Sequence, residues 1–139
     1  MAVCSFLEME SGASVLHYFL GVVILESLKE PGVLDHRATI IEESNIAAPP
    51  GDPYPVWSRR LVRVPAESMW ALATDISHHM TEDFYNHFVD DTTLVVVFKS
   101  RYFVLDKFDK TTWQPMVEYG KTVRVGPEWT SSIPITAEF

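Results

Sequence analysis

The densest group of side chains that could do chemistry lies between residues 78 and 87 and consists of His78, His79, Glu82, Asp83 and His87. A metal site there would need His79 and Asp83 four positions apart on one face of a continuing helix, with His87 folding back as the third ligand. Histidines at the carboxyl end of a helix are also stabilised by the helix dipole without any further role. The dipole explanation is favoured, and the metal site is the alternative.

Motifs for nucleophilic or nucleotide chemistry are missing from the sequence. The six glycines form neither a Gly-x-Ser-x-Gly turn nor a glycine-rich phosphate loop, and there is no His-Glu-x-x-His pair. The single cysteine, Cys4, stands near the amino terminus, where a thiol lacks the fixed electropositive setting that catalysis needs. We therefore expect no cofactor.

Arginines and large aromatic side chains cluster around residues 54–63. On a strand, Arg59 and Arg63 share a face with Trp57, an arrangement that could stack on and pair with an acidic loop of a protein partner. The alternative is a purely structural role, in which the arginines form cross-strand charge pairs with glutamates such as Glu42 and Glu43. Tryptophan and tyrosine dominate interface hot spots. The candidate partner-binding residues are Tyr54, Trp57, Arg59 and Arg63.

Net charge, hydropathy and cysteine content indicate which classes of partner and which cellular location to expect. Lys and Arg number 11 against 19 Asp and Glu, which gives a net charge of -8. This sign disfavours nucleic acids and anionic membranes, because binding to phosphates requires positive charge. The longest apolar run, residues 15–28, contains His17 and Glu26 and is shorter than the ~20 residues of a membrane span. Because Cys4 can form no intramolecular disulfide, we expect a cytoplasmic protein.

The first half of the chain is predicted to form strands that are separated by turns and by a proline-rich segment. Residues 1–14 show no lasting period and are expected to be a loosely ordered lead-in. Strands are predicted over 15–25, with a bend at Gly21, over 37–43 and over 56–64. A helix over 15–25 is the competing interpretation. Prolines crowd residues 47–55, which predicts a stiff connector and the one plausible internal boundary.

The second half begins with the clearest helix of the chain. Pro65 opens it, and apolar residues from Met69 to Met80 recur at helical spacing. Three strands of a meander are predicted over 84–89, 94–98 and 102–105. A capping box at Thr111 and Gln114 predicts a short helix that ends at Gly120. The tail is expected to hold a short strand at 122–125 and to pack Trp129 back on the body.

The order of these elements lacks the strand-helix alternation of a parallel sheet. It predicts a single α+β domain over residues 1–139, with an antiparallel sheet of about five to six strands and two helices packed on one face.

The region from Val56 to Gly126 resembles short bacterial proteins of unknown function. The likeness is carried by the amphipathic helix and by four stretches, Asp83-Phe84-Tyr85-Asn86-His87-Phe88, Val95-Val96-Val97-Phe98, Tyr102-Phe103-Val104-Leu105 and Glu118-Tyr119-Gly120. Similar chains tend to have glycine in the turn where this one has Ser100. The resemblance implies a shared fold and a bacterial or phage origin, and it transfers no activity.

These patterns together predict a small non-catalytic binding or protein-interaction module. The alternative is a small metal- or acid/base-dependent enzyme that uses the histidines and carboxylates of residues 78–87. A module would show an exposed aromatic or acidic patch, whereas an enzyme would show a concave pocket with converging polar groups and shifted pKa values. The partner is expected to be a protein, or a second copy paired through an edge strand near residues 37–43.

Overall fold

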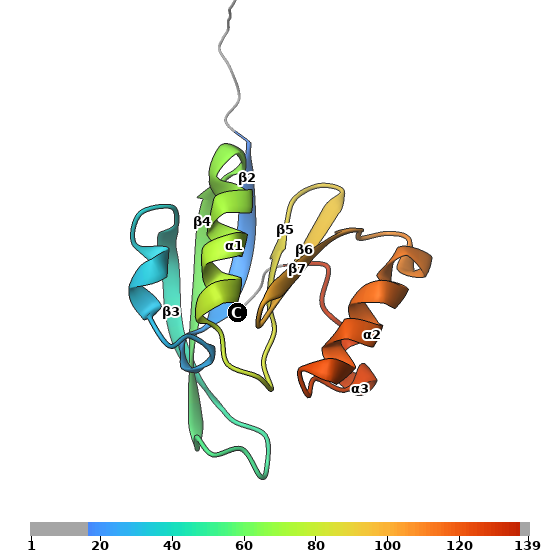
Figure 1. Cartoon of the computed structure of the whole chain (residues 1–139). Helices are drawn as coiled ribbons and strands as arrows, with labels where there is room; N and C mark the ends of the chain where they lie inside the picture. The colour runs from blue at the N-terminus through green and yellow to red at the C-terminus, as the bar shows by residue number, and fades with distance from the viewer. Residues whose placement is uncertain (1–16, 137–139) are drawn as a thin grey trace, which may run out of the picture.

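The computed structural model describes residues 17–136, so the predicted lead-in over 1–14 and Cys4 lie outside the described residues. Six antiparallel strands form one sheet in the order β3-β4-β2-β5-β6-β7 (Figure 1). The strands are β2 (Tyr18–Ile24), β3 (Thr39–Ala47), β4 (Val56–Pro65), β5 (Asn86–Val89), β6 (Thr93–Phe98) and β7 (Arg101–Asp106). The α-helices are α1 (Met69–His79), α2 (Gln114–Thr122) and α3 (Pro127–Thr130). Short 3-10 turns are η1 (Leu25–Ser27), η2 (Pro31–Leu34), η3 (Ala66–Ser68) and η4 (Lys110–Trp113).

The two longer helices lie on opposite faces of the sheet. Val95 and Val97 of β6 belong to the core under α1, whereas Val96 and Phe98 belong to the core under α2. Figure 1 shows β5, β6 and β7 between the two helices. The antiparallel α+β architecture is confirmed, but the placement of both helices on one face is wrong. The reason is that β6 is apolar on both faces, so each face needs its own cover.

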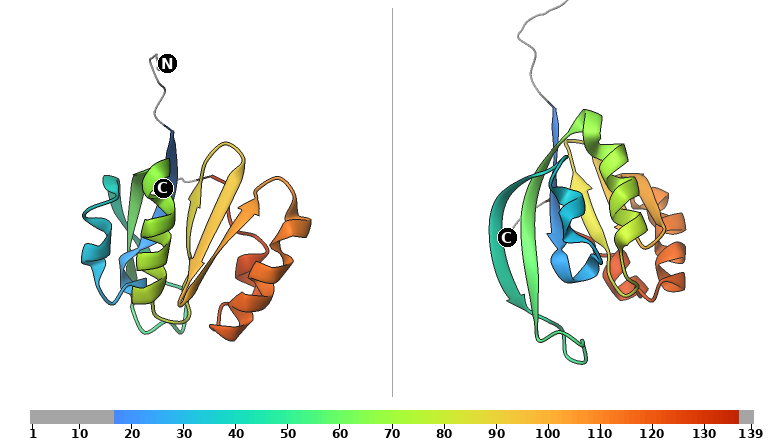
Figure 2. Two further views of the ribbon diagram at one scale, coloured as in Figure 1. Left: turned by 45° about the horizontal axis from the view of Figure 1, so that its top comes forward. Right: turned by 60° about the vertical axis from the view of Figure 1, so that its left-hand side comes forward.

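In the half of the sheet formed by β2, β3 and β4, the helices within residues 17–136 cover one face and leave the other open. Val62 and Val64 of β4 are fully buried in the core under α1. Among the described residues, the core under α2 contains side chains of β5, β6 and β7 and none from the other three strands. Alternate positions such as Leu20 remain 39% exposed. The face of β2, β3 and β4 that points away from α1, visible in the right panel of Figure 2, is called the open face below.

Most of the predicted strands are present, with shifted ends. The strand interpretation of β2 is confirmed over residues 18–24, as are β4 and the β5-β6-β7 meander. β3 extends past the predicted residue 43 because its pairing with β4 continues to Ala47 opposite Val56. The proline-rich residues 47–55 therefore join two paired strands as a hairpin loop, closed by a hydrogen bond from the Ala48 N–H to the Pro55 carbonyl (3.1 Å).

The carboxyl-terminal third differs more from the prediction. Asp109, rather than Thr111, supplies the capping side chain, since its carboxylate accepts from the Thr111 N–H. Gly120 does not end the helix: it is closely packed, and a Cβ there would lie 3.1 Å from the Val125 carbonyl oxygen. Helix α2 continues to residue 122, so the strand expected over 122–125 is wrong. None of the helices within residues 17–136 has the length and apolar character that crossing a membrane requires.

Gly21 allows a side chain of β5 to lie directly against the backbone of β2. It lies opposite Phe88 in the pairing of β2 with β5, and a Cβ at residue 21 would overlap the Phe88 ring. The ring is fully buried under α1. The sequence-predicted bend at this glycine thus marks a position where only a hydrogen atom fits.

We expect Gly21→Ala to destabilise the protein by about 1–3 kcal/mol, because the added methyl group forces the buried ring or the backbone to move. The matched control is Gly32→Ala, where the nearest atoms would lie 3.7 Å from the new Cβ. Urea unfolding followed by tryptophan fluorescence measures both free energies. Equal midpoints for Gly21→Ala and the wild type would contradict the packing argument.

Candidate functional site

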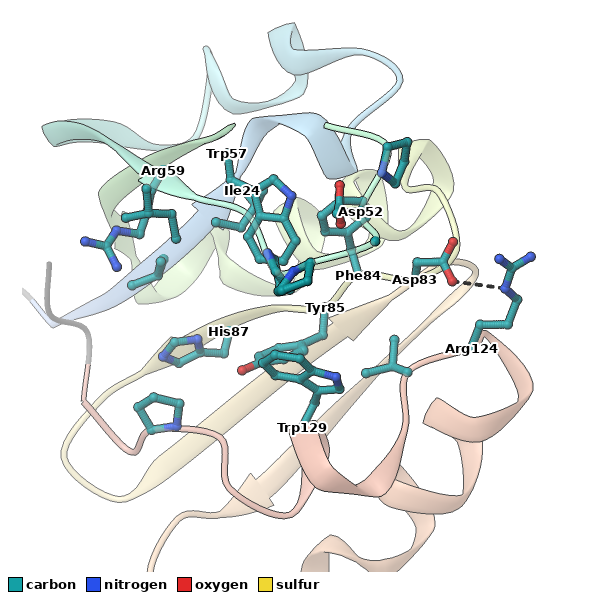
Figure 3. Close-up of a pocket in the computed structure, with 18 of the residues that line it drawn as sticks. Ile24, Asp52, Trp57, Arg59, Asp83, Phe84, Tyr85, His87, Arg124 and Trp129 are labelled. Atoms are coloured by element: carbon teal, nitrogen blue, oxygen red, sulfur yellow. Dashed lines mark ion pairs between the residues drawn. The ribbon is translucent and has the colours of Figure 1, made fainter. Parts of the chain in front are cut away.

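A groove of about 760 Å³ lies on the open face of the sheet, which the helices of residues 17–136 leave uncovered (Figure 3). Its floor comes from β2 and β5, with Val22 and His87 among the lining side chains, and Trp57 of β4 stands on one side. The hairpin loop over 49–53 and the segment that contains Trp129 form its walls. The groove therefore combines residues that are far apart in the sequence and meet only because β2 pairs with both β4 and β5.

Aromatic rings line the groove on both sides. Trp57 and Phe84 lie with ring centroids 5.2 Å apart, and Figure 3 shows Trp57 across the groove from Tyr85 and Trp129. The Trp57 Nε1 atom is buried without a hydrogen-bond partner among the described residues. A buried indole N–H normally finds an acceptor, so this side chain holds an unused donor beside the groove.

An ion pair between two strained residues closes one end of the groove. The Arg124 Nε atom lies 3.0 Å from an Asp83 carboxylate oxygen, as the dashed line in Figure 3 marks. Both residues have left-handed backbone conformations, with φ of 79° at Asp83 and 67° at Arg124. The Asp83 N–H donates to the Val123 carbonyl (2.9 Å) and so ties the two turns together. Strained backbone of this kind persists only where the surroundings enforce it.

His87 is held as a neutral ring. It is 6% exposed, and its Nε2 atom lies 3.0 Å from the Thr136 carbonyl oxygen. Since a carbonyl only accepts, Nε2–H is the donor, and Nδ1 of the neutral ring is left as an acceptor. Burial lowers the pKa of His87, and the hydrogen bond to Thr136 only partly opposes that shift.

Tyr85 lies beside His87 in the groove, with ring centroids 6.3 Å apart. In Figure 3 its hydroxyl group points toward the His87 ring. Burial raises the pKa of Tyr85, so the hydroxyl group stays protonated at neutral pH. The two side chains together present uncharged hydrogen-bonding groups to the groove.

The histidines and carboxylates of residues 78–87 do not converge. The His79 Nδ1 atom donates to the Asp75 carbonyl one turn earlier in α1 (2.8 Å), while Asp83 pairs with Arg124. Helix α1 ends at His79, so the continuing helix that would align His79 with Asp83 does not form. His78 is exposed, and Glu82 lies 3.8 Å from Arg124. Within residues 17–136 no three His, Cys, Asp or Glu side chains are grouped so that they could hold a metal ion.

The candidate partner-binding residues are divided between the groove and its surroundings. Trp57 and Arg59 line the groove, and the Arg59 Nε atom donates to Ser44 (3.3 Å). Tyr54 is 44% exposed on the hairpin loop, and Arg63 lies farther along β4 with its guanidinium carbon 5.0 Å from the Tyr18 ring centroid. The cross-strand alternative is realised by the third arginine of the cluster, since Arg60 pairs with Glu43 (3.7 Å).

Sequence reasoning missed the second wall of the groove. Trp129 was expected to pack on the body, yet it is 48% exposed and lines the groove. Tyr85 and Phe84 were assigned to a strand without a role. The usable signal was the concentration of tryptophan and proline in two separate stretches, 49–57 and 127–134, which are the two walls.

Comparisons of the chain with protein-family models, with curated proteins and with solved structures find no match.

Replacing His87 should change how stability depends on pH. Because burial lowers the pKa of His87, the unfolded chain, with a histidine pKa of about 6.5, takes up a proton before the folded protein does. The free energy of unfolding should therefore fall as the pH drops below about 6.5, until the folded-state pKa is passed. We expect His87→Gln, which keeps an N–H donor for Thr136, to reduce this loss by up to about 1.4 kcal/mol per pH unit.

Denaturant unfolding at several pH values between about 5 and 7.5 measures the effect. The control is His78→Gln, since this side chain is exposed on α1 and has no burial to relieve. Parallel pH profiles for the wild type and His87→Gln would contradict the assignment.

The strain at Asp83 can be separated from its ion pair. Asp83→Ala and Asp83→Gly both lose the pair, but only glycine relieves the left-handed backbone, so we expect Asp83→Gly to be more stable by about 1–2 kcal/mol. The same exchange at Asp75, inside α1 and paired with Arg37, should have the opposite sign, because glycine is the poorer helix former. Thermal unfolding of the four variants tests this, and the same sign at both positions would refute it.

Proposed function

We propose that this protein is a non-catalytic binding module whose groove takes a small, neutral ligand that contains an aromatic ring. The observation that carries the proposal is the aromatic lining on both sides of a 760 Å³ groove, on the one part of the sheet that the described helices leave uncovered. Ligand pockets of proteins fall in the same range of volume and have similarly apolar linings.

The lining favours a flat, apolar ligand body. Trp57 on one side and Trp129 on the other offer ring faces, and offset stacking between rings stabilises a complex beyond the burial of area. The hairpin loop adds three proline rings, at positions 49, 50 and 53, whose backbone conformations are already restricted. A wall of this kind loses little conformational entropy when a ligand binds.

The charges around the groove favour a neutral ligand. Two carboxylates, Asp52 and Asp83, and two guanidinium groups, Arg59 and Arg124, line it, so their formal charges cancel. His87 adds no charge at neutral pH, because burial lowers its pKa. A ligand with a net charge would gain little from such a balanced set, because each attraction to it is offset by a repulsion.

The groove also has two features expected of an active site, since it is concave and contains two residues with shifted pKa values. Both shifts, however, come from burial: they hold His87 deprotonated and Tyr85 protonated, away from the pKa near 7 that acid/base work needs. No charged partner tunes either group among the causes of its shift, so the binding role is the better supported one.

The amino-acid composition supports a proposal on the cellular location and on the classes of partner. We infer that the protein acts in the cytoplasm without nucleic acid or membrane as partner, supported by its single cysteine and its net charge of -8.

Indole is a suitable probe because it is neutral, planar and carries one ring N–H. We expect it to shift the NMR resonances of Trp57 and other groove residues, with a Kd on the order of 1 mM. Tryptamine and indole-3-acetate have the same ring with opposite charges, and neither should bind more tightly than indole. Tighter binding of either ion would overturn the preference for a neutral ligand.

Two half-exposed tryptophans provide matched variants. Trp129→Ala removes a groove wall and should weaken indole binding about fivefold or more, whereas Trp70→Ala, on α1, should leave it unchanged. Their exposed fractions are similar, 48% and 43%, so Trp70→Ala controls for the general effect of losing a half-exposed indole ring. The binding role fails if groove resonances do not move at saturating indole, or if both variants lose binding equally.

A further inference from the structure

Strand β7 ends the sheet on one side, and its backbone alternates between inward and outward hydrogen-bonding groups. Phe98 and Arg101 close a two-residue turn, so this pair exchanges hydrogen bonds, as does every second pair along the hairpin. The Lys107 N–H donates to the Thr92 carbonyl (3.1 Å), which continues the same pattern beyond the strand. Odd-numbered residues of β7 therefore face β6, and Tyr102, Val104 and Asp106 face outward.

The outward edge is free over a short, defined stretch. The Asp106 carbonyl already accepts from the Asp109 N–H (3.2 Å) and from the Trp113 indole N–H (2.9 Å). Within residues 17–136 no hydrogen bond occupies the outward N–H and C=O groups of Tyr102 and Val104. The available edge therefore consists of two donors and two acceptors centred on Phe103.

An exposed apolar patch adjoins this edge. Val104 is 53% exposed, and Tyr102 stacks on Trp70 of α1 with an interplanar angle of 10° and ring centroids 6.3 Å apart. Trp70 itself is 43% exposed. Tyr102 and Val104 point to the same face as α1, because side chains two positions apart share a face of a strand. The three side chains form one patch beside the free edge.

We propose that β7 is a dimerisation edge that pairs antiparallel with β7 of a second copy. The two-fold axis is perpendicular to the sheet and passes midway between the Phe103 residues of the two copies. In this register Tyr102 lies opposite Val104 of the second copy, and Val104 lies opposite its Tyr102. Each such pair exchanges two backbone hydrogen bonds and brings an aromatic ring against a β-branched side chain, a favourable cross-strand combination. The register leaves the Asp106 carbonyl with the partners that it already has.

A second copy fits this surface better than an isolated peptide strand does. A peptide could supply the backbone groups, but only a copy of this chain also brings a second Trp70 to the same face of the extended sheet. The two patches then meet across the axis, and each covers the exposed Val104 of the other.

The other edge of the sheet is less suited to this pairing. Sequence analysis pointed to residues 37–43, and the structure does place β3 at an edge. Its register shifts between Ile40 and Glu42, which marks a bulge, and Glu42 and Glu43 would approach the same residues of a second copy. Bulges and charges are the usual means by which edges avoid pairing. β7 pairs with β6 without a register shift.

Sedimentation velocity of the full chain from about 1 to 500 μM tests the proposal and should show a reversible monomer-dimer equilibrium. Val104→Pro removes an outward N–H that takes part in no hydrogen bond within residues 17–136, so it should keep the fold and weaken the dimer by about tenfold or more. Val104→Lys should act in the same direction. Its matched control is Ile41→Lys on β3, at 48% exposure, which should dimerise like the wild type.

Amide hydrogen exchange identifies the edge that is used. The Tyr102 and Val104 amides should exchange more slowly as the protein concentration rises, because dimerisation engages them. Three results would overturn the proposal: a monomer at every concentration, a dimer that both Val104 variants leave intact, or a dimer whose formation leaves these two amides unprotected.

Discussion

The pairing of β2 with β5 is the constraint on which the remaining structure depends. It consists of three opposed residue pairs, from Leu20 with Val89 to Val22 with His87. A buried amide secures its end: the Asn86 side chain accepts from the Ile24 N–H (2.9 Å) and donates to the Ser27 hydroxyl group (3.0 Å). A buried amide with these partners satisfied specifies one register, since a slip would leave polar atoms unpaired. This short junction joins the β3-β4-β2 half of the sheet to the β5-β6-β7 half.

The groove is a consequence of that junction. Among the described helices, α1 and α2 lie on the two faces of the β5-β6-β7 half, whereas the other half has a helix on one face. The number of layers therefore changes where β2 meets β5. Val22 and His87 are opposed at the step and line the groove. The strained turns at Asp83 and Arg124 lie at its end, where the chain enters β5 and leaves α2. The cavity, the left-handed turns and the two buried groups with shifted pKa values thus lie together at this junction.

Local sequence patterns were enough to predict most of the helices and strands, whereas the site depends on long-range strand pairing. The spacing of apolar residues from Met69 to Met80 identified α1, and β-branched residues identified β6, because each signal repeats within one element. The face covered by α2 was predicted wrongly, although the fully apolar run of β6 already demanded cover on both sides. Of the site, Trp57, Arg59, Asp83 and His87 were singled out, but as members of two separate groups. Their meeting depends on the order of the strands, which no local pattern encodes.

The position of β2 in the sheet has a consequence for biosynthesis. This strand is made first among those described, yet both of its neighbours, β4 and β5, follow it in the chain. The β3-β4 and β6-β7 hairpins each pair two strands that are consecutive in the chain and can form while the chain is still emerging from the ribosome, whereas β2 must wait for residues 86–89. Until then its apolar residues have no strand on one side, so the interval between the synthesis of β2 and of β5 is the period in which a chaperone would be of most use.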